Sequence, residues 1–277
     1  MSVNSRSAIA VILMISRLRQ ILKAAPAPPL AAIPEGQRVY AIGDIHGRAD
    51  LFAAMIAAID ADDISRGSAQ TTTILLGDLI DRGPDSAGVI RQAREWQRKR
   101  LVRVLMGNHE EMFLDALEHD EVMRHFLRFG GREMLLSYPL DPMVYTRAEL
   151  GEVANLAREV IPAQDIEFIR GFEDQIELGD YLFVHAGIRP GVALPNQRAG
   201  DLRWIREAFI DHDESFGRVV VHGHTISDSA QIRHNRIGID TGAYRSGRLT
   251  ALGLEGTNRW LLTSVAEDGA VRVQTEE

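Results

Sequence analysis

Cysteine is absent from this sequence of 277 residues. Its absence excludes disulfide bonds, thiolate metal ligands and any catalysis that uses a cysteine nucleophile. A chain without cysteine suits a reducing compartment, so we predict that the protein is cytoplasmic. Hydrophobic residues make up 45% of the sequence and charged residues 25%, as in an ordinary globular protein. The length allows one large domain or two small ones.

An excess of basic residues is also missing. Lysine and arginine together number 31, against 39 aspartate and glutamate residues, which gives a formal net charge of −8. General nucleic-acid binding depends on basic side chains that neutralise phosphates, so we expect no nucleic-acid partner. The oligomeric state does not follow from the sequence.

The N-terminus has no apolar run long enough to cross a membrane. The run Ala8–Ile15 is far shorter than the roughly 20 residues that a spanning helix needs. We predict that residues 1–36 are a flexible extension that includes the Pro/Ala linker Ala24–Pro34, and that residues 37–277 form a single domain. Three basic residues follow the apolar run. The alternatives are therefore a basic amphipathic helix in weak contact with a membrane surface, or the h-region of a signal peptide.

Five short segments share one pattern, in which an apolar run rich in Val, Ile and Leu ends in polar residues. Such runs read as buried strands that each lead into a loop at the carboxyl end. Glycines beside the polar residues allow the backbone to turn sharply there. The five segments are Val39–Gly47 (VYAIGDIHG), Thr73–Pro84 (TILLGDLIDRGP), Val102–Glu110 (VRVLMGNHE), Tyr181–Gly187 (YLFVHAG) and Val219–Thr225 (VVVHGHT).

The remaining elements complete a layered α/β pattern. Helical periodicity over Asp50–Ile59 and Ser86–Lys99 predicts a β-α-β-α-β beginning. Three further helical stretches are predicted between the third and fourth of the polar segments, at residues 110–136, 147–158 and 162–171. From Gln175 onward the chain is rich in predicted strands, namely 181–184, 218–221, 236–239, 249–254 and 260–265.

The polar residues at the five strand ends form an oxygen and nitrogen ligand set large enough for two divalent metal ions. Such a pair, about 3.5–4 Å apart, stabilises the attacking and leaving oxygens of a phosphoryl transfer. Manganese is the first expectation, and iron, zinc or magnesium suit the same ligands. Each residue alone has an ordinary structural interpretation, such as a turn, a helix cap or a buried histidine. The candidates are Asp44, His46, Asp78, Asn108, His109, His185, His222 and His224.

Asp81 and Arg82, which follow Asp78 in the same segment, suggest phosphate binding and proton transfer. Arg82 has a planar set of donors that suits a phosphate group, although a surface ion pair would explain it equally well. Asp81 is a carboxylate that could orient a histidine, and His109 is a candidate proton donor to a leaving oxygen.

With these motifs in view, the chain resembles the PPP branch of the calcineurin-like metallophosphoesterases. That branch holds the Ser/Thr protein phosphatases, bacteriophage lambda phosphatase and similar bacterial enzymes. The matching segments GDIHG, GDLIDRGPDS, GNHE, HAG and GHT occur in the family order and cover roughly Arg38 to Leu254. The resemblance implies an α/β four-layer sandwich, in which two central mixed β-sheets are flanked by helices.

The resemblance also implies a role for each of the matching residues. Asp44 and His46 would bind the first metal ion, and Asp78 would bridge both ions. The second ion would be bound by Asn108, His185 and His224.

Four further residues would act on the substrate. His109 would be the general acid, paired with Asp81. Arg82 would hold phosphate, and Arg206 in the segment Trp204-Ile205-Arg206-Glu207 would be the second phosphate-binding arginine. His222 has no settled role in the family.

The reaction implied is hydrolysis of a phosphomonoester by a metal-bound hydroxide. The substrate expected first is a phosphoprotein or phosphopeptide carrying phosphoserine or phosphothreonine. The alternative is diadenosine tetraphosphate or another nucleotide. Relatives with that activity commonly depart from the His of GDxHG or the Asp-Arg of DRG, and this chain keeps both. A non-catalytic scaffold is a third interpretation, which the complete ligand set disfavours.

Overall fold

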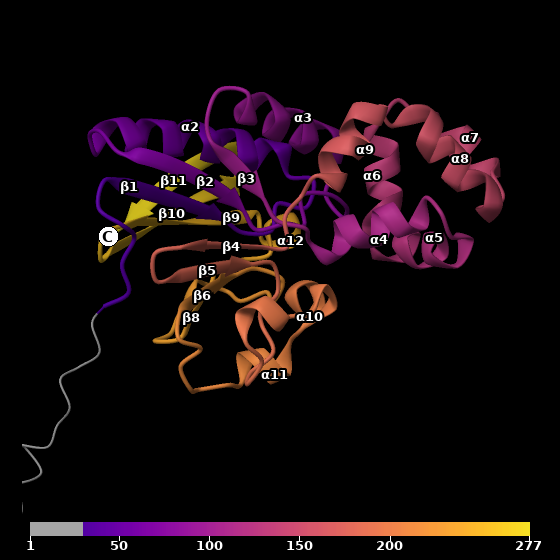
Figure 1. Ribbon diagram of the computed structural model, residues 1–277. Helices are drawn as coiled ribbons and strands as arrows, with labels where there is room; N and C mark the ends of the chain where they lie inside the picture. The colour runs from indigo at the N-terminus through magenta and orange to yellow at the C-terminus, as the bar shows by residue number, and fades with distance from the viewer. Residues whose placement is uncertain (1–29) are drawn as a thin grey trace, which may run out of the picture. The chain divides into compact units, whose positions relative to one another are not determined.

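Two mixed β-sheets form the centre of the fold (Figure 1). The computed structural model describes residues 30–277. The first sheet has six strands in the order β11-β10-β9-β1-β2-β3. Their bounds are Ala270–Glu276 for β11, Asn258–Glu267 for β10, Arg248–Glu255 for β9, Gln37–Ile42 for β1, Gln70–Leu75 for β2 and Val102–Val104 for β3.

The second sheet has five strands in the order β4-β5-β6-β8-β7. Both sheets contain parallel pairs: β1 with β2 and β2 with β3 on one side of the first sheet, and β5 with β6 and β6 with β8 at the centre of the second. Parallel neighbours end at the same edge of a sheet, so the loops that follow them meet there. The bounds are Gln175–Leu178 for β4, Tyr181–Val184 for β5, Val219–His222 for β6, Gln231–Ile232 for β7 and Arg236–Gly238 for β8.

Strand β1 shows how the layers are held together. Val39 and Ala41 belong to the apolar cluster that also contains residues of the second sheet. The alternate residues Tyr40 and Ile42 belong to the cluster that the helices cover. Both faces of the strand are therefore buried, which is why it reads as an almost continuous apolar run.

Helices cover the outer faces of both sheets. α2 (Ala49–Ser65) and α3 (Ser86–Gln97) pack on the first sheet, and α10 (Ala199–Trp204) and α11 (Glu207–Ile210) lie on the second. The result is four layers, which confirms the predicted α/β sandwich of two mixed sheets flanked by helices.

The predicted helix over residues 110–136 is broken into shorter pieces. Gly130 has a φ of 108°, and a Cβ atom on Gly131 would lie 2.4 Å from the Phe126 ring, so the two glycines allow a turn that an unbroken helix excludes. The helices between β3 and β4 are α4 (Asn108–Ala116), α5 (Asp120–Phe126), the π-helical turn η1 (Leu127–Gly131), α6 (Arg132–Ser137), α7 (Pro142–Arg147), α8 (Leu150–Val160) and α9 (Ala163–Arg170).

The predicted strands after Gln175 are present, with longer bounds for β9 and β10. The sequence analysis missed the short strands β4 and β7 of the second sheet. It also missed β11, which pairs antiparallel with β10 at the edge of the first sheet. Its residues alternate between half-buried and exposed and are mostly polar, so it lacks the apolar run that marked the central strands.

The compact unit begins at Ala31, earlier than the predicted start at residue 37. Ile33 is 2% exposed, and its N–H donates to the Gly256 carbonyl at 2.9 Å. Ala32 exchanges hydrogen bonds with Asp180, through its N–H to Oδ2 at 2.9 Å and through its carbonyl to the Asp180 N–H at 3.0 Å. The last part of the predicted linker therefore packs on the domain. The rest of the predicted extension, with its membrane-surface alternative, lies outside the described residues.

Among residues 30–277, no helix is long and apolar enough to cross a membrane.

The packing of Ile33 predicts a sharp difference between two truncations. A protein that starts at Glu35 should unfold with a free energy about 2–4 kcal/mol lower than one that starts at Leu30, because it loses one buried isoleucine and its backbone hydrogen bonds. Denaturant unfolding of the two proteins measures the difference. Ile33→Ala in the longer protein should reproduce about half of it, whereas equal stabilities would contradict the packing.

Candidate metal centre

The loops at the carboxyl ends of the strands hold an unusual backbone. The described residues contain six non-glycine residues with positive φ, and five of them are residues of the predicted site. Such conformations cost about 1–3 kcal/mol each and concentrate where function requires them. The five are His46 (45°), Asp78 (50°), Asp81 (70°), Arg82 (65°) and His224 (62°), and the sixth is Asp268 in the β10–β11 turn.

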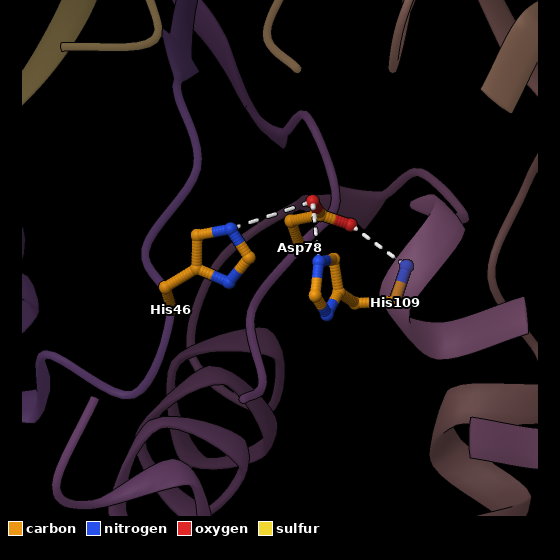
Figure 2. Close-up of side chains that lie close together, drawn as sticks. All are labelled: His46, Asp78 and His109. Atoms are coloured by element: carbon orange, nitrogen blue, oxygen red, sulfur yellow. Dashed lines mark hydrogen bonds and ion pairs between the residues drawn. The ribbon is translucent and has the colours of Figure 1, made fainter. Parts of the chain in front are cut away.

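A first cluster gathers around one carboxylate oxygen of Asp78 (Figure 2). Nε2 of His46 lies 3.5 Å from Asp78 Oδ2, and Nε2 of His109 lies 4.0 Å from the same oxygen. His46 and Asp78 come from the loops after β1 and β2, His109 comes from the first turn of α4, and all three are buried. This group could hold a metal ion.

A second cluster gathers around the other oxygen of Asp78. Nε2 of His185 lies 3.5 Å from Asp78 Oδ1, 3.0 Å from Oδ1 of Asn108 and 3.3 Å from Nδ1 of His224. Asp78, His185 and His224 could also hold a metal ion. Asp78 therefore belongs to both clusters, in the position that a bridging ligand would occupy.

Backbone carbonyls fix two of the histidines. Nδ1 of His46 lies 2.8 Å from the Ile80 carbonyl, and Nδ1 of His185 lies 2.8 Å from the Leu76 carbonyl. A carbonyl only accepts, so each Nδ1 carries the proton and each Nε2 presents its lone pair toward Asp78. This is the usual way in which a protein orients a metal-binding imidazole.

Asp44 lies in the loop after β1 and belongs to neither of these two clusters. Its carboxylate oxygens accept the His224 N–H at 3.2 and 3.1 Å. Burial raises the pKa of Asp44 well above its usual range, and the neighbouring carboxylates of Asp240 and Asp78 raise it further. Asp240 was missed in the sequence analysis, because an Asp in a short strand-to-turn segment carries no signal of its own.

Asp81, His109 and Arg82 form a connected chain. Oδ2 of Asp81 lies 2.6 Å from Nδ1 of His109, and Nε2 of that ring lies 2.7 Å from Nη2 of Arg82. The arginine can only donate, so Nε2 accepts and the proton sits on Nδ1, facing Asp81. Burial raises the pKa of Asp81 and lowers that of His109. The guanidinium cation at Nε2 disfavours a metal ion at the same nitrogen.

Arg206 lies at the start of α11 and is exposed. Its positive charge lowers the pKa of Asp78, after the larger effect of burial, which raises it. Within residues 30–277 its side chain forms no ion pair or hydrogen bond. The preceding Trp204 donates from Nε1 to the Glu111 carboxylate, which anchors this segment to α4.

His222 turns away from the two clusters. Its ring packs edge-on against Phe209 of α11, with centroids 5.0 Å apart, and its Nδ1 lies 3.0 Å from the Gly223 carbonyl. Burial lowers its pKa to about 4. Of the two histidines in the HGH segment, His224 therefore lies among the candidate ligands and His222 in the packing behind them.

The donor set fits divalent cations. Burial raises the pKa of both Asp78 and Glu110 to about 7. Nε2 of His224 is buried without a hydrogen-bond partner, which is unusual for a polar atom unless a ligand completes it. Oxygen and imidazole ligands without sulfur are suited to manganese, iron, zinc or magnesium.

A four-layer α/β sandwich with two histidine–aspartate clusters at the ends of its strands defines a metallophosphoesterase. Residues 37–243 match the calcineurin-like phosphoesterase family, and the chain belongs to it. It is therefore a hydrolase of that family, as the resemblance in its motifs predicted.

Several named relatives act on chains of phosphate groups. The zinc-dependent endopolyphosphatase of Saccharomyces cerevisiae is 26% identical over 251 residues, which cover 76% of this chain and 74% of the yeast protein. The asymmetrical bis(5'-nucleosyl)-tetraphosphatase PrpE of Bacillus velezensis is 28% identical and covers 76% of this chain and 86% of its own. The second name is that of a hydrolase of nucleoside polyphosphates, the class of substrate that the sequence analysis gave as its alternative.

One solved structure, provisionally described as a diadenosine tetraphosphatase, has a TM-score of 0.55 at 19% identity and covers 89% of this chain and 99% of its own. A cold-active protein tyrosine phosphatase has a TM-score of 0.52 at 18% identity, covering 87% and 81%. At these identities the two structures show the shared fold.

The place of Asp78 in both clusters generates a prediction about metal content. Protein stripped with a chelator should lose hydrolysis and regain it with Mn²⁺. Asp78→Asn should lower the content of both ions together, because one carboxylate serves the two clusters. Elemental analysis measures this, with the exposed Asp115→Asn as the matched control. Full activity in protein confirmed to be metal-free would contradict the prediction.

A second prediction separates His109 from the metal ligands. His109→Asn should keep wild-type metal content and lower turnover by about 10²–10⁴, the usual contribution of a general acid. The loss should shrink for aryl phosphates, whose leaving groups need little protonation. The exposed His125→Asn is the control. Release of one ion by His109→Asn would instead make His109 a ligand.

Proposed function

We propose that this protein hydrolyses the phosphate chain of a nucleoside polyphosphate, with a bis(5'-nucleosyl) tetraphosphate as the representative substrate. The observation that carries the proposal is the pair of clusters that share Asp78 beside the Asp81–His109–Arg82 chain. The choice of substrate class is supported by relatives with this name. One of them, from Nitrosospira multiformis, is 24% identical and covers 84% of this chain and 98% of its own.

Two divalent ions would be held in this site, and Asp78 would be shared between them. The first would also take Asp44 and His46. The second would take the residues that surround the other oxygen of Asp78, namely Asn108, His185 and His224. When bound, such ions activate water and neutralise negative charge that develops on phosphate oxygens. Manganese remains our first choice of metal, and the zinc-dependent yeast relative supports zinc as a second.

His109 would hold and deliver a proton from Nε2 to the leaving oxygen. Asp81, 2.6 Å from Nδ1, orients the ring and stabilises it when it becomes charged. Arg82 lies 2.7 Å from the same Nε2, so it must leave that nitrogen before the ring can carry a proton there. A substrate phosphate would draw the guanidinium away, since a bidentate phosphate contact is stronger than one to a neutral imidazole.

Arg206 would bind a second set of phosphate oxygens. Its guanidinium has no partner within residues 30–277, and its positive charge lowers the pKa of Asp78, His185 and His224. A polyphosphate chain carries several anionic groups, so two arginines on different loops suit it well.

The half-buried Tyr244 borders the site, and Trp204 lies two residues before Arg206; both support a substrate that carries a base. The Tyr244 ring lies 4.9 Å from the Arg82 guanidinium carbon and 5.4 Å from the His46 ring. Trp204 is 42% exposed, and its indole is held by Glu111. Exposed aromatic faces bind nucleobases by stacking, at about 1–3 kcal/mol per base. The sequence analysis gave neither residue a role, because a single aromatic residue in a loop has no distinguishing pattern.

Phosphoprotein hydrolysis is the second candidate. Serine/threonine-protein phosphatase 1 of Salmonella typhimurium is 37% identical over 81 residues, which cover 29% of this chain and 33% of that protein. The cytoplasm would provide either substrate.

A panel of substrates tests the proposal. With saturating Mn²⁺, kcat/KM should be higher for diadenosine tetraphosphate than for a phosphoserine peptide. Tyr244→Ala should lower kcat/KM about tenfold for the dinucleotide, since it removes stacking, and leave tripolyphosphate almost unchanged. Tyr244→Phe keeps the ring and is the matched control. Faster turnover of the phosphopeptide than of the dinucleotide would replace the first candidate with the second.

A further inference from the structure

Glu110 is a buried carboxylate of the GNHE segment that none of the roles above uses. It lies in the first turn of α4 and is fully buried. Its Oε2 accepts the N–H groups of Asp78 at 2.8 Å and Gly107 at 3.1 Å. Its Oε1 accepts the N–H groups of Leu79 at 2.7 Å and Ile80 at 3.3 Å. Within residues 30–277 it forms no ion pair with a basic side chain.

Only its bond to Gly107 belongs to ordinary helix capping. A glutamate at the third helical position commonly accepts the N–H of the residue before the helix. The other three bonds run to consecutive amides of a loop 30–32 residues away in the sequence. Glu110 therefore ties the start of α4 to the loop that follows β2.

That loop needs an external acceptor. Asp78 has a φ of 50°, so the backbone after β2 leaves the strand direction, and its buried N–H groups have no ladder partners. A Cβ atom on Gly107 would lie 2.2 Å from Asp78 Oδ1 and 2.6 Å from Glu110 Oε2. Glycine is thus required where the two loops meet, and the carboxylate fills the remaining space between them.

The amides that Glu110 holds belong to residues that set the metal site. Asp78 carries the carboxylate shared by the two clusters. Ile80 carries the carbonyl that lies 2.8 Å from Nδ1 of His46 and so orients that ring. Adjacent His109 donates its own N–H to Asp78 Oδ1 at 3.0 Å, from the same helical turn as Glu110. One side chain therefore fixes the bridging carboxylate and, through Ile80, a histidine of the first cluster.

We propose that Glu110 is a positioning residue for both metal ions, holding the Asp78–Ile80 backbone so that Asp78, in its left-handed conformation, aims the shared carboxylate between the two clusters. The inference rests on the proposed metal centre and adds a residue that touches neither substrate nor ion. Residues that orient metal ligands through hydrogen bonds usually contribute a factor of about 10–100 to metal affinity.

The carboxylate is required in preference to an amide. Each of its oxygens accepts two N–H groups, and glutamine has one oxygen and one NH₂ group. In either orientation, Glu110→Gln sets an NH₂ group against two backbone donors. Aspartate keeps the charge but is one methylene shorter, so Glu110→Asp reaches one pair of amides at most.

The test measures metal binding without substrate. Glu110→Gln and Glu110→Asp are titrated with Mn²⁺ by calorimetry at a temperature well below the unfolding midpoint of each metal-free protein. Both variants should bind Mn²⁺ about 10–100-fold more weakly, with the two ions affected together. His185→Ala should weaken the second ion alone. The exposed Glu118→Gln, just beyond α4, should match wild type.

Activity provides a second readout. Raising the Mn²⁺ concentration should restore much of kcat in Glu110→Asp, because the ligands themselves are intact. Unchanged Mn²⁺ affinity in a folded Glu110 variant that melts at a lower temperature would show a structural cap and overturn the proposal. If Glu110→Gln does not fold, the Mn²⁺ affinity of Glu110→Asp decides. If neither variant folds, Glu110 contributes to stability alone, and the proposal is overturned. A wild-type protein that binds two ions but hydrolyses no nucleotide would refute the proposed function and leave this inference standing.

Discussion

The contact of Asp78 with both histidine clusters is the constraint on which the rest of the site depends. Its two oxygens face different groups, with His46 and His109 near one and His185 near the other. A single carboxylate can serve two groups only if its backbone leaves the strand at a steep angle. The positive φ of Asp78 provides that angle, and Glu110 supplies the hydrogen bonds that the strained loop lacks.

The strain is concentrated at one edge of the two sheets and is supported by regular packing elsewhere. The clusters of apolar residues between the sheets and beneath the helices are continuous with the strands whose ends carry the site. Rigid parallel strands bring loops from distant parts of the chain to the same edge. The strands provide the stability, and the loops can then hold conformations that would not persist on their own.

The residues around the metal centre would affect which phosphate compound the site selects. Arg82 and Arg206 come from different segments of the chain. The Tyr244 ring packs against Arg82, and Trp204 precedes Arg206 by two residues. A phosphopeptide and a dinucleotide would make similar contacts at the reacting phosphate. They would differ at this border, where a base can stack on an aromatic ring and further phosphates can pair with arginine. Under the proposed function, substrate choice would therefore depend on the surroundings more than on the ligand set.

The sequence by itself determined the central strands and most of the polar residues at their ends. Apolar runs that finish in Gly, Asp, Asn or His are local patterns, and they predicted β1, β2, β5 and β6 together with the candidate ligands. The motif order then indicated the family. Local patterns failed where a neighbour decides the outcome, as at Gly130, which breaks the long predicted helix.

Only the tertiary structure decided which residues meet. His224 faces Asp44 across 180 positions of sequence, whereas His222, two residues earlier, packs on Phe209. Glu110, Asp240 and Tyr244 gained their places beside the site through contacts of the same long-range kind. A residue's type and immediate neighbours fix what chemistry it can perform. Its partners depend on how distant strands align, which no local pattern contains.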